Sequence, residues 1–243
     1  MARRGRAARL EGRAAFRPPT GKTLDESSLT EQGLAAPERK TGRILLIACG
    51  ALAREILDIK KVNELDHIDL TCLPAKLHLY PEQIVEYVEA AVKKYASVYD
   101  TIHVVYADCG TGGELERKCA ELGVEMIAGP HCYSFFEGNE KFAEYGEAGE
   151  ITAFYLTDFL VKQFDAFIWR PMGLDKNPEL RDMIFGNYTK LVYQSQISDP
   201  ALVDKARTCA ERMGLEFEHR HTGYGDLETA LNNWSRPTPA PDS

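Results

Sequence analysis

Short apolar runs alternate with segments of helical periodicity between residues 43 and 128. Arg43–Ala48 has the continuous apolar character of a strand that is buried on both faces, and Ala51–Val62 follows it with helical spacing. Three more such runs and the two helical segments between them follow: His67–Leu73, Pro81–Tyr95, Thr101–Ala107, Gly113–Leu122 and Val124–Ala128. This alternation predicts an α/β fold with a doubly wound, mostly parallel, Rossmann-like sheet.

The second half of the chain alternates less regularly. Helical spacing recurs at Ile151–Phe164, Pro178–Phe185, Pro200–Met213 and Asp226–Trp234. Strand-like runs recur at Ala166–Trp169, Thr189–Gln194 and Leu215–Glu218. We expect these strands to extend the first sheet to about six or seven strands. Residues 135–164 are then expected to lie over its upper edge as a helical lid.

Charge is distributed unevenly along the 243 residues. Residues 1–22 carry seven basic side chains and one acidic one, whereas the rest carries 22 basic and 36 acidic side chains, a net charge of −14. An acidic body argues against nucleic-acid binding. We predict a disordered basic leader over 1–42, one α/β domain over 43–234 and a disordered tail over 235–243. A transit peptide or a nucleic-acid-binding tail is the alternative interpretation of the leader.

The chain contains six cysteines and no apolar stretch of the roughly 20 residues that a membrane span requires. It also lacks the apolar core of a secretory signal, so we expect a cytoplasmic protein with reduced thiols and no membrane partner. No two cysteines form a Cys-x-x-Cys pair. Any metal site must therefore be assembled from distant parts of the chain.

Three cysteines follow predicted strands directly or within a few residues. In an open parallel sheet, ligands bind beyond the carboxyl ends of the strands, and Cys49, Cys109 and Cys132 all belong to that edge. Three thiolates with an open fourth position predict a catalytic zinc site or, alternatively, a [4Fe-4S] cluster with one open iron. His131 and His78 are candidates for the fourth ligand or for a proton carrier. The alternative is simple packing, because cysteine is among the most buried residue types.

The other three cysteines are better explained by the core. Cys72 lies near the same edge and is either a core residue or part of the site. Cys119 and Cys209 share apolar stripes with their helical neighbours, so we expect both to be packed in the interior.

Other candidate site residues flank the strand ends or occur in irregular segments. The catalytic candidates are Asp108 and Arg170, and the cofactor-binding candidates are Gly50, Gly110, Thr111, Gly112, Gly113 and Tyr224. The helix that begins near Gly113 is expected to lower the pKa of Cys109. The glycine-rich loop is also a weak candidate for a phosphate cradle, although it matches no nucleotide motif. Arg170 is suited to clamping a carboxylate or phosphate, although an Arg–Asp pair that stabilises a loop is the favoured interpretation.

Seven segments carry a resemblance to a known family: IACGALAREI (Ile47–Ile56), LPAKLH (Leu73–His78), ADCGTGGEL (Ala107–Leu115), GPHCYSFF (Gly129–Phe136), YLTDFL (Tyr155–Leu160), GLDKNPELRD (Gly173–Asp182) and FGNYTKLVY (Phe185–Tyr193). Through them the chain resembles a bacterial and archaeal family of unknown function, number 1638 among such families, over about residues 43–232. His78-Leu79-Tyr80 departs from the expected pattern, which has a more polar residue after the histidine. The resemblance implies an association with corrinoid-dependent methyltransferase systems, and hence with one-carbon metabolism.

These observations lead to one functional hypothesis and two alternatives. The leading hypothesis is a metal-dependent enzyme that acts on a small-molecule substrate, with methyl transfer as its reaction, because a thiolate-bound zinc holds a substrate thiol deprotonated. A [4Fe-4S] enzyme with three cysteine ligands is the first alternative. A non-catalytic accessory protein that binds a metal, a corrinoid protein or a methyltransferase is the second.

Overall fold

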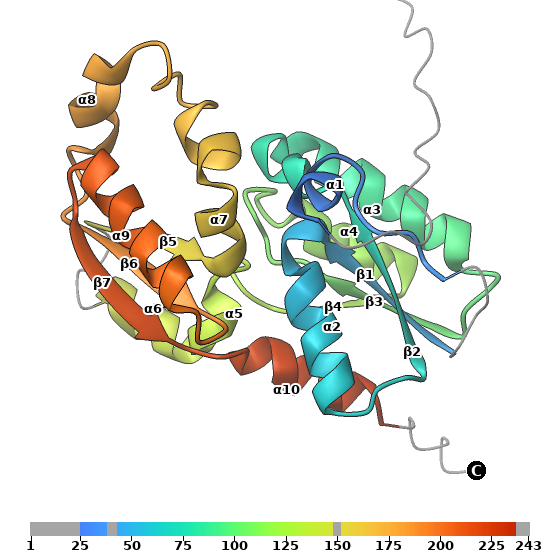
Figure 1. Cartoon of the computed structure of the whole chain (residues 1–243). Coiled ribbons are helices and arrows are strands. Elements are labelled where there is room, and N and C mark those ends of the chain that lie inside the picture. Colours follow the sequence, from blue (N-terminus) through green and yellow to red (C-terminus); the bar gives the residue numbers. More distant parts are fainter. Residues whose placement is uncertain (1–24, 38–42, 148–151, 237–243) are drawn as a thin grey trace, which may run out of the picture.

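The computed structural model describes residues 25–37, 43–147 and 152–236 (Figure 1). Helix α1 (Glu26–Glu31) precedes the first sheet, and Leu34 forms an antiparallel bridge with Cys72. Both lie in the range predicted to be a disordered leader, so that prediction is corrected for residues 25–37. The buried Leu29 and the hydrogen bonds of Leu34 to Cys72 hold this segment in place. Residues 1–24, 38–42 and 237–243, where the rest of the predicted leader and most of the tail fall, lie outside the described residues.

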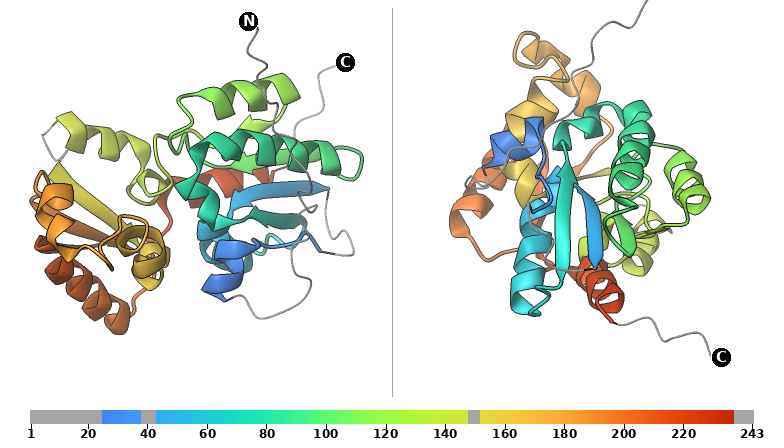
Figure 2. Two further views of the ribbon diagram at one scale, coloured as in Figure 1. Left: turned by 90° about the horizontal axis from the view of Figure 1, so that it is seen from above. Right: turned by 90° about the vertical axis from the view of Figure 1, so that its right-hand side faces the viewer.

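The first sheet contains four parallel strands in the order β2-β1-β3-β4. They are β1 (Ile44–Cys49), β2 (Ile68–Leu73), β3 (Thr101–Val105) and β4 (Glu125–Met126). The connecting helices are η1 (Gly50–Leu52), α2 (Ala53–Val62), η2 (Ala75–Leu79), α3 (Pro81–Tyr95) and α4 (Glu114–Leu122). Helix α2 lies on one face of the sheet, and α3 and α4 lie on the other (Figure 2). The central strand β1 is therefore covered on both faces, as its unbroken apolar sequence predicts.

The second sheet contains three parallel strands in the order β5-β6-β7. They are β5 (Ala153–Thr157), β6 (Lys190–Ser195) and β7 (Glu216–His221). The helical segments of this half are α6 (Asn139–Glu147), α7 (Asp158–Lys162), the π-helical turn η4 (Asp165–Trp169), η5 (Pro178–Leu180), α8 (Arg181–Phe185) and α9 (Pro200–Met213). Helix α5 (Ser134–Glu137) leads from the first sheet towards the second, and α10 (Gly225–Trp234) closes the chain.

The prediction of one sheet with six or seven strands is wrong, because the described strands divide into sheets of four and three. Two elements account for much of the error. The expected helix over Ile151–Phe164 is β5 followed at once by α7, and the expected strand over Ala166–Trp169 is η4. Residues 135–164 therefore contribute a strand to the second sheet and are not a purely helical lid. Apolar runs of this length are compatible with either a buried strand or a buried helix, so periodicity alone did not separate them.

Helix α10 returns from the second sheet to pack on the first (Figures 1 and 2). It contacts α2 and α5, and its Leu227 and Leu231 are fully buried. The Trp234 ring stacks on His103 of β3, with ring centroids 4.4 Å apart. The two sheets are thus tied together by the chain's own path. We call the first sheet with α1–α5 and α10 the first lobe, and the second sheet with α6–α9 the second lobe.

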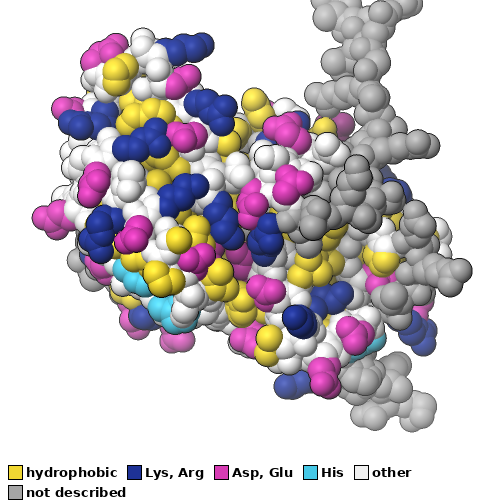
Figure 3. All heavy atoms as spheres, in the orientation of Figure 1, with side chains coloured by type: hydrophobic (Ala, Val, Ile, Leu, Met, Phe, Trp, Pro, Cys, Tyr) yellow, Lys and Arg dark blue, Asp and Glu magenta, His cyan; other side chains and the backbone are white. Residues whose placement is uncertain are grey.

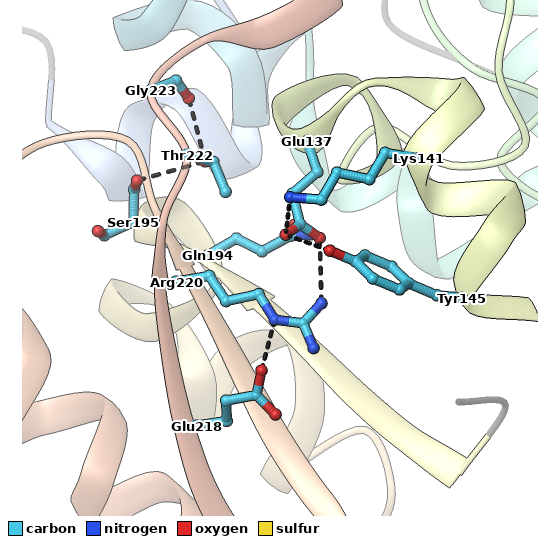
Figure 4. A network of polar contacts seen from close by, with 9 residues as sticks. All are labelled: Glu137, Lys141, Tyr145, Gln194, Ser195, Glu218, Arg220, Thr222 and Gly223. Atoms are coloured by element: carbon cyan, nitrogen blue, oxygen red, sulfur yellow. Dashed lines mark hydrogen bonds and ion pairs between the residues drawn. The ribbon is translucent and has the colours of Figure 1, made fainter. Parts of the chain in front are cut away.

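A buried ionic network joins α5 to the second sheet (Figure 4). The Glu137 carboxylate accepts hydrogen bonds from Gln194 Nε2 at 2.8 Å and from Tyr145 Oη at 3.3 Å, and it lies 3.4 Å from Arg220 Nη1. Only 3% of the Glu137 side chain and 15% of the Arg220 side chain are exposed. A buried charge is tolerated when it is paired and hydrogen-bonded, and here the pairing fixes how α5 meets β6 and β7.

Among the described residues, no helix has both the length and the apolar character needed to cross a bilayer.

Candidate functional site

A cavity of about 50 Å³ lies where the two lobes meet, at the carboxyl ends of the first sheet's strands. Its lining includes Cys49, His78, Cys109, His131, Cys132 and Tyr133 from the first lobe and Thr157, Phe159, Leu160 and Phe167 from the second. Within the sheet, β2 lies next to β1 on one side, and β3, the following strand in the sequence, lies next to β1 on the other side. The carboxyl ends of β1 and β3 thus form the point where strand order reverses, which is the usual ligand position in an open parallel sheet.

The predicted meeting of remote thiols is clearest for Cys109 and Cys132. Their Sγ atoms are 3.2 Å apart, although 23 residues separate them in sequence. Two backbone hydrogen bonds hold their loops together, from Asp108 N to Gly129 O at 2.9 Å and from Cys109 N to Pro130 O at 3.3 Å. The thiols therefore meet because the loop after β4 continues the backbone pairing of the segment after β3.

The Cys109 thiol has an unusual electrostatic environment. A hydrogen bond from Cys132 and the proximity of His78 lower the pKa of Cys109 from its usual 9.0 to about 5, against the opposing effect of burial. The same contact and burial raise the pKa of Cys132 well above its usual value. The pair accordingly holds one proton on Cys132 and one negative charge on Cys109 near neutral pH.

The backbone of Cys109 is strained. Its φ is +47°, in the left-handed region, where a residue with a side chain costs roughly 1–2 kcal/mol relative to ordinary conformations. Such strain is kept only when surrounding contacts enforce it, and it is concentrated at functional sites. Here it is one more feature that distinguishes Cys109 from a packed core cysteine.

Cys49 and the two histidines complete the polar lining of the cavity. Cys49 ends β1, and burial raises its pKa to about 12, so the isolated thiol is neutral. Burial also lowers the pKa of His131, which favours its neutral imidazole with a free nitrogen lone pair. The His131 ring stacks on Tyr133, and Tyr133 stacks in turn on Tyr155 of β5 at 5.3 Å between centroids. This stack orients His131 and connects the lobes beside the cavity.

Tyr106 is a site residue that sequence reasoning missed. Its side chain is 1% exposed, and its hydroxyl makes no well-formed hydrogen bond among the described residues, although it lies close enough to the Cys49 thiol to lower the pKa of that thiol. Burial raises its pKa, and so do nearby thiols, which are those of Cys49, Cys132, Cys109 and Cys72. A buried hydroxyl without a well-formed hydrogen bond costs about 1–3 kcal/mol, so its placement among thiols is informative. In the sequence it is indistinguishable from an ordinary core aromatic.

Apolar side chains of the second lobe form the opposite wall and were also missed. Phe159 and Leu160 come from α7, and Phe167 comes from η4. No sequence signal assigns them to this cavity, because they face the first sheet only after the second lobe has formed. They shield the thiols from water, so charges in the cavity are weakly screened.

The hydrogen-bond donors of the glycine-rich loop after β3 bind a carboxylate at the start of the same loop. The Asp108 carboxylate accepts hydrogen bonds from Gly113 N at 2.6 Å, Gly112 N at 3.3 Å and Thr111 Oγ1 at 3.0 Å. The bond from Gly113 is the main reason why the pKa of Asp108 is lowered. These donors therefore point to Asp108 and not to a ligand. The pKa of Cys109 is lowered as expected, but the cause is different: Cys132 and His78 lower it, and not the start of the helix.

Gly50 has a packing reason. A Cβ at this position would lie 2.6 Å from the Leu29 carbonyl oxygen and 2.9 Å from that of Leu73. Only glycine lets the turn after β1 approach α1 and β2 so closely. Gly110 has a φ of +84° and contributes a turn next to Cys109.

The remaining predicted residues lie away from the cavity lining. Tyr224 donates a hydrogen bond to Asp58 at 3.3 Å, and Arg170 is an exposed residue that follows η4. Cys72 is fully buried in β2, where its carbonyl and amide bond to Leu34. Cys119 and Cys209 are core residues of α4 and α9, as predicted.

The thiols and histidines share a cavity without forming a complete coordination sphere. Within residues 25–37, 43–147 and 152–236, no group of three or more His, Cys, Asp and Glu side chains is arranged to hold a metal ion. The arrangement nevertheless supplies a thiolate, two further thiols and a neutral imidazole around one cavity, with the buried hydroxyl of Tyr106 near the thiols. Such a set is suited to binding a soft metal or to thiol chemistry.

The profile of a family described as "Protein of unknown function (DUF1638)" matches residues 72–231, more than half of the chain. The chain belongs to this family. Among proteins with curated descriptions, none is significantly similar to the chain.

The match places most of the cavity within the DUF1638 segment. It includes His78, Cys109, His131 and Cys132, and it extends through the second sheet to Leu231 of α10. The resemblance described above was drawn from about residue 43, whereas the match begins at Cys72. Strand β1 and Cys49 therefore precede the matched part of this DUF1638 chain.

Proposed function

We propose that this DUF1638 protein is a metal-dependent enzyme of small-molecule metabolism, with one zinc ion bound by Cys109, Cys132 and Cys49. The observation that carries the proposal is the 3.2 Å contact between Cys109 and Cys132 inside a cavity that Cys49 also lines. Thiolates are preferred zinc ligands, and Cys109 already favours its thiolate form.

The geometry favours one ion over a cluster. Two sulfurs on adjacent corners of a zinc tetrahedron stand about 3.8 Å apart, given zinc–thiolate bonds of about 2.3 Å. The Sγ atoms of Cys109 and Cys132 are 3.2 Å apart. They therefore need to separate by only about 0.6 Å to bind zinc once the proton between them is lost. A [4Fe-4S] cluster places iron and sulfide between its cysteines and requires a wider separation. The cavity of about 50 Å³ also suits an ion with a small ligand, since one water needs about 10–15 Å³.

The other polar groups have roles that follow from their positions. His131 or His78 supplies the fourth ligand or carries a proton, and the neutral imidazole of His131 is suited to either role. Burial raises the pKa of Cys49, but the Tyr106 hydroxyl lowers it and would help to keep that sulfur in its thiolate form on the metal. A bound zinc would supply Lewis acidity and would lower the pKa of a coordinated thiol or water.

The substrate class in this proposal is a small molecule with a thiol or similar soft nucleophile. Holding such a group deprotonated prepares it for methyl transfer, and the family resemblance adds a corrinoid protein or methyltransferase as the partner. We place the protein in the reducing cytoplasm as part of this proposal, because cysteines persist there as thiols that can bind a metal. A non-catalytic accessory role would use the same metal site without turnover.

A second candidate function rests on the same sulfur contact. Cys109 and Cys132 would act as a redox dithiol: the Cys109 thiolate attacks a substrate disulfide and releases one thiol, and Cys132 then displaces the second thiol to form the Cys109–Cys132 disulfide. A disulfide requires the sulfurs to approach to about 2.05 Å, a movement of about 1.1 Å. This movement is larger than the opening that zinc requires. We therefore rank the dithiol function second.

Metal analysis of protein purified anaerobically tests the proposal. We expect about one zinc per chain in the wild type and at least a tenfold loss of zinc affinity in Cys109→Ser and Cys132→Ser, as is usual when a ligand is removed. Cys119→Ser is the matched control, because this thiol is buried in α4 outside the cavity. It should retain zinc like the wild type.

Three other outcomes decide between the candidates. Iron with a brown colour would favour the cluster. Failure of the wild type to bind zinc or iron, combined with a reversible Cys109–Cys132 disulfide, would replace the metal proposal with the dithiol one. Zinc bound equally well by Cys109→Ser would remove Cys109 from the site.

A further inference from the structure

A second pocket, separate from the cavity of Cys109 and Cys132, lies in the second lobe between the end of α7, η4 and α9. Its volume is about 280 Å³. Four basic residues line it, Lys162, Arg170, Lys205 and Arg212, with Asp165 as the acidic residue of the lining. The net charge of these side chains is positive in a body that is otherwise strongly acidic. Figure 3 shows Lys and Arg side chains, interspersed with Asp and Glu, over the region of α7 and α9.

The guanidinium of Arg212 is held rigidly. It pairs with Asp165 Oδ1 at 2.8 Å and stacks on the rings of Trp169 and Phe164, 4.3 and 5.0 Å from their centroids. A stacked and paired guanidinium is pre-organised, so little side-chain entropy is lost when its remaining N–H groups bind an anion.

Two other cations lack a counter-charge within the described part of the chain. Lys205 Nζ donates to the carbonyl of Lys162 at 3.0 Å, and Arg170 Nε donates to the carbonyl of Asp165 at 3.2 Å. These bonds stabilise the ends of helical turns, which is the ordinary role of such residues. They use one donor each, whereas an ammonium has three donors and a guanidinium five. The charge and the other donors remain available beside the pocket.

We propose that this pocket binds the phosphate group of a small metabolite. Lys162 pairs with Glu26 at 3.6 Å and Arg212 pairs with Asp165, so Lys205 and Arg170 are the cations whose charge a bound dianion balances while it accepts charge-assisted hydrogen bonds. The volume of about 280 Å³ lies just below the usual range of about 300–1,000 Å³ for ligand sites. It fits a phosphorylated molecule of sugar size and not a dinucleotide. Arg170, singled out in the sequence for anion binding, belongs to this pocket and not to the thiol cavity.

Calorimetric titration of the full chain with inorganic pyrophosphate in about 0.15 M salt tests the site. We expect saturable binding to one site, and a loss of affinity of about tenfold or more in the double variant Lys205→Gln with Arg170→Gln. The matched control is Lys61→Gln with Arg117→Gln, which removes the same charge from exposed positions of α2 and α4. The control should bind like the wild type. No binding by the wild type, or equal weakening in both double variants, would overturn the proposal.

A thermal shift experiment adds a second readout. Ribose 5-phosphate should raise the Tm of the wild type and of the control, whereas ribose should not, because the two differ in the phosphate alone. The pocket variant should lose this shift while melting cooperatively by itself. An equal shift with ribose would exclude the phosphate as the recognised group. The zinc proposal and the phosphate proposal are tested independently, because Cys109→Ser should leave pyrophosphate binding unchanged.

Discussion

At the scale of single residues, Cys109 concentrates the unusual chemistry of this protein. It combines a left-handed backbone, a thiol contact at 3.2 Å and 8% exposure. Its pKa, lowered to about 5, follows mainly from the hydrogen bond of Cys132. Because the unfolded chain lacks this contact, the native state releases the Cys109 proton at a lower pH than the unfolded state does.

This difference predicts a pH-dependent stability. Between about pH 5 and pH 8 the unfolded state binds more protons at Cys109 than the native state, so native stability rises with pH. The rise for one proton cannot exceed about 1.4 kcal/mol per pH unit. We expect the difference in unfolding free energy between wild type and Cys109→Ser, measured in urea on reduced, metal-free protein, to grow with pH across this window. The raised pKa of Cys132 acts only above its usual 9.0 and does not interfere.

Cys119→Ser is the control for this measurement. The pKa of Cys119 is raised to about 11, so its titration lies outside the window and its stability difference from wild type should be flat. Parallel curves for Cys109→Ser and Cys119→Ser would mean that Cys109 is protonated at neutral pH. The charge assigned to the cavity would then be wrong.

Residue identities predicted part of this site and concealed another part. Cys109 and Cys132 were expected together because cysteine followed two different strand ends. Tyr106 was not expected, since one tyrosine near the end of a buried strand carries no sign that its hydroxyl lies near thiols. Phe159 and Phe167 were missed for a related reason. Their contact with the thiols depends on how two lobes dock, and local sequence contains no such information.

At the scale of elements, the bounds of a helix or strand were predictable where the sequence marks its first or last residue. Helices α3 and α9 begin at Pro81 and Pro200 and have the predicted bounds, because proline at the first helical position marks the start. Strand β5 was taken for part of a helix, since Thr157 ends the strand and at once caps α7 by accepting from Leu160 N. With no turn between strand and helix, the apolar run carried no visible boundary.

The short helix α5 provides a test of how elements are joined across the lobes. Glu137→Ala leaves Arg220 and Gln194 without their shared acceptor in a largely buried place. Arg220 keeps its ion pair with Glu218 at 2.5 Å, so the loss comes mainly from the donors left unpaired and is about 1–3 kcal/mol of unfolding free energy, measured in urea. Glu114→Ala removes an exposed carboxylate 3.8 Å from Arg117 and should cost less than about 0.5 kcal/mol. Equal losses in the two variants would show that the network of Figure 4 is not buried in solution.

At the scale of the whole molecule, local patterns predicted the class of fold but not the division into two sheets. Each strand was judged by its own apolar run, and such runs do not specify which strand is the neighbour. The division into two sheets nevertheless creates the cavity, because the second lobe covers the carboxyl ends of β1 and β3. The return of α10 to the first sheet then ties the two lobes to each other.

The two tryptophans allow this dependence to be measured, since Trp234 packs on the first sheet and Trp169 lies in the second lobe. In Trp234→Phe, fluorescence reports the second lobe alone, and in Trp169→Phe it reports the first. We expect the fluorescence midpoint in urea to coincide with that of circular dichroism within each variant, because α10, the Glu137 network and the Tyr133–Tyr155 stack all cross between the lobes. Comparison within one variant removes the effect of the substitution on stability. Two separated transitions would mean that the lobes fold independently, and the cavity between them would then open without unfolding either sheet.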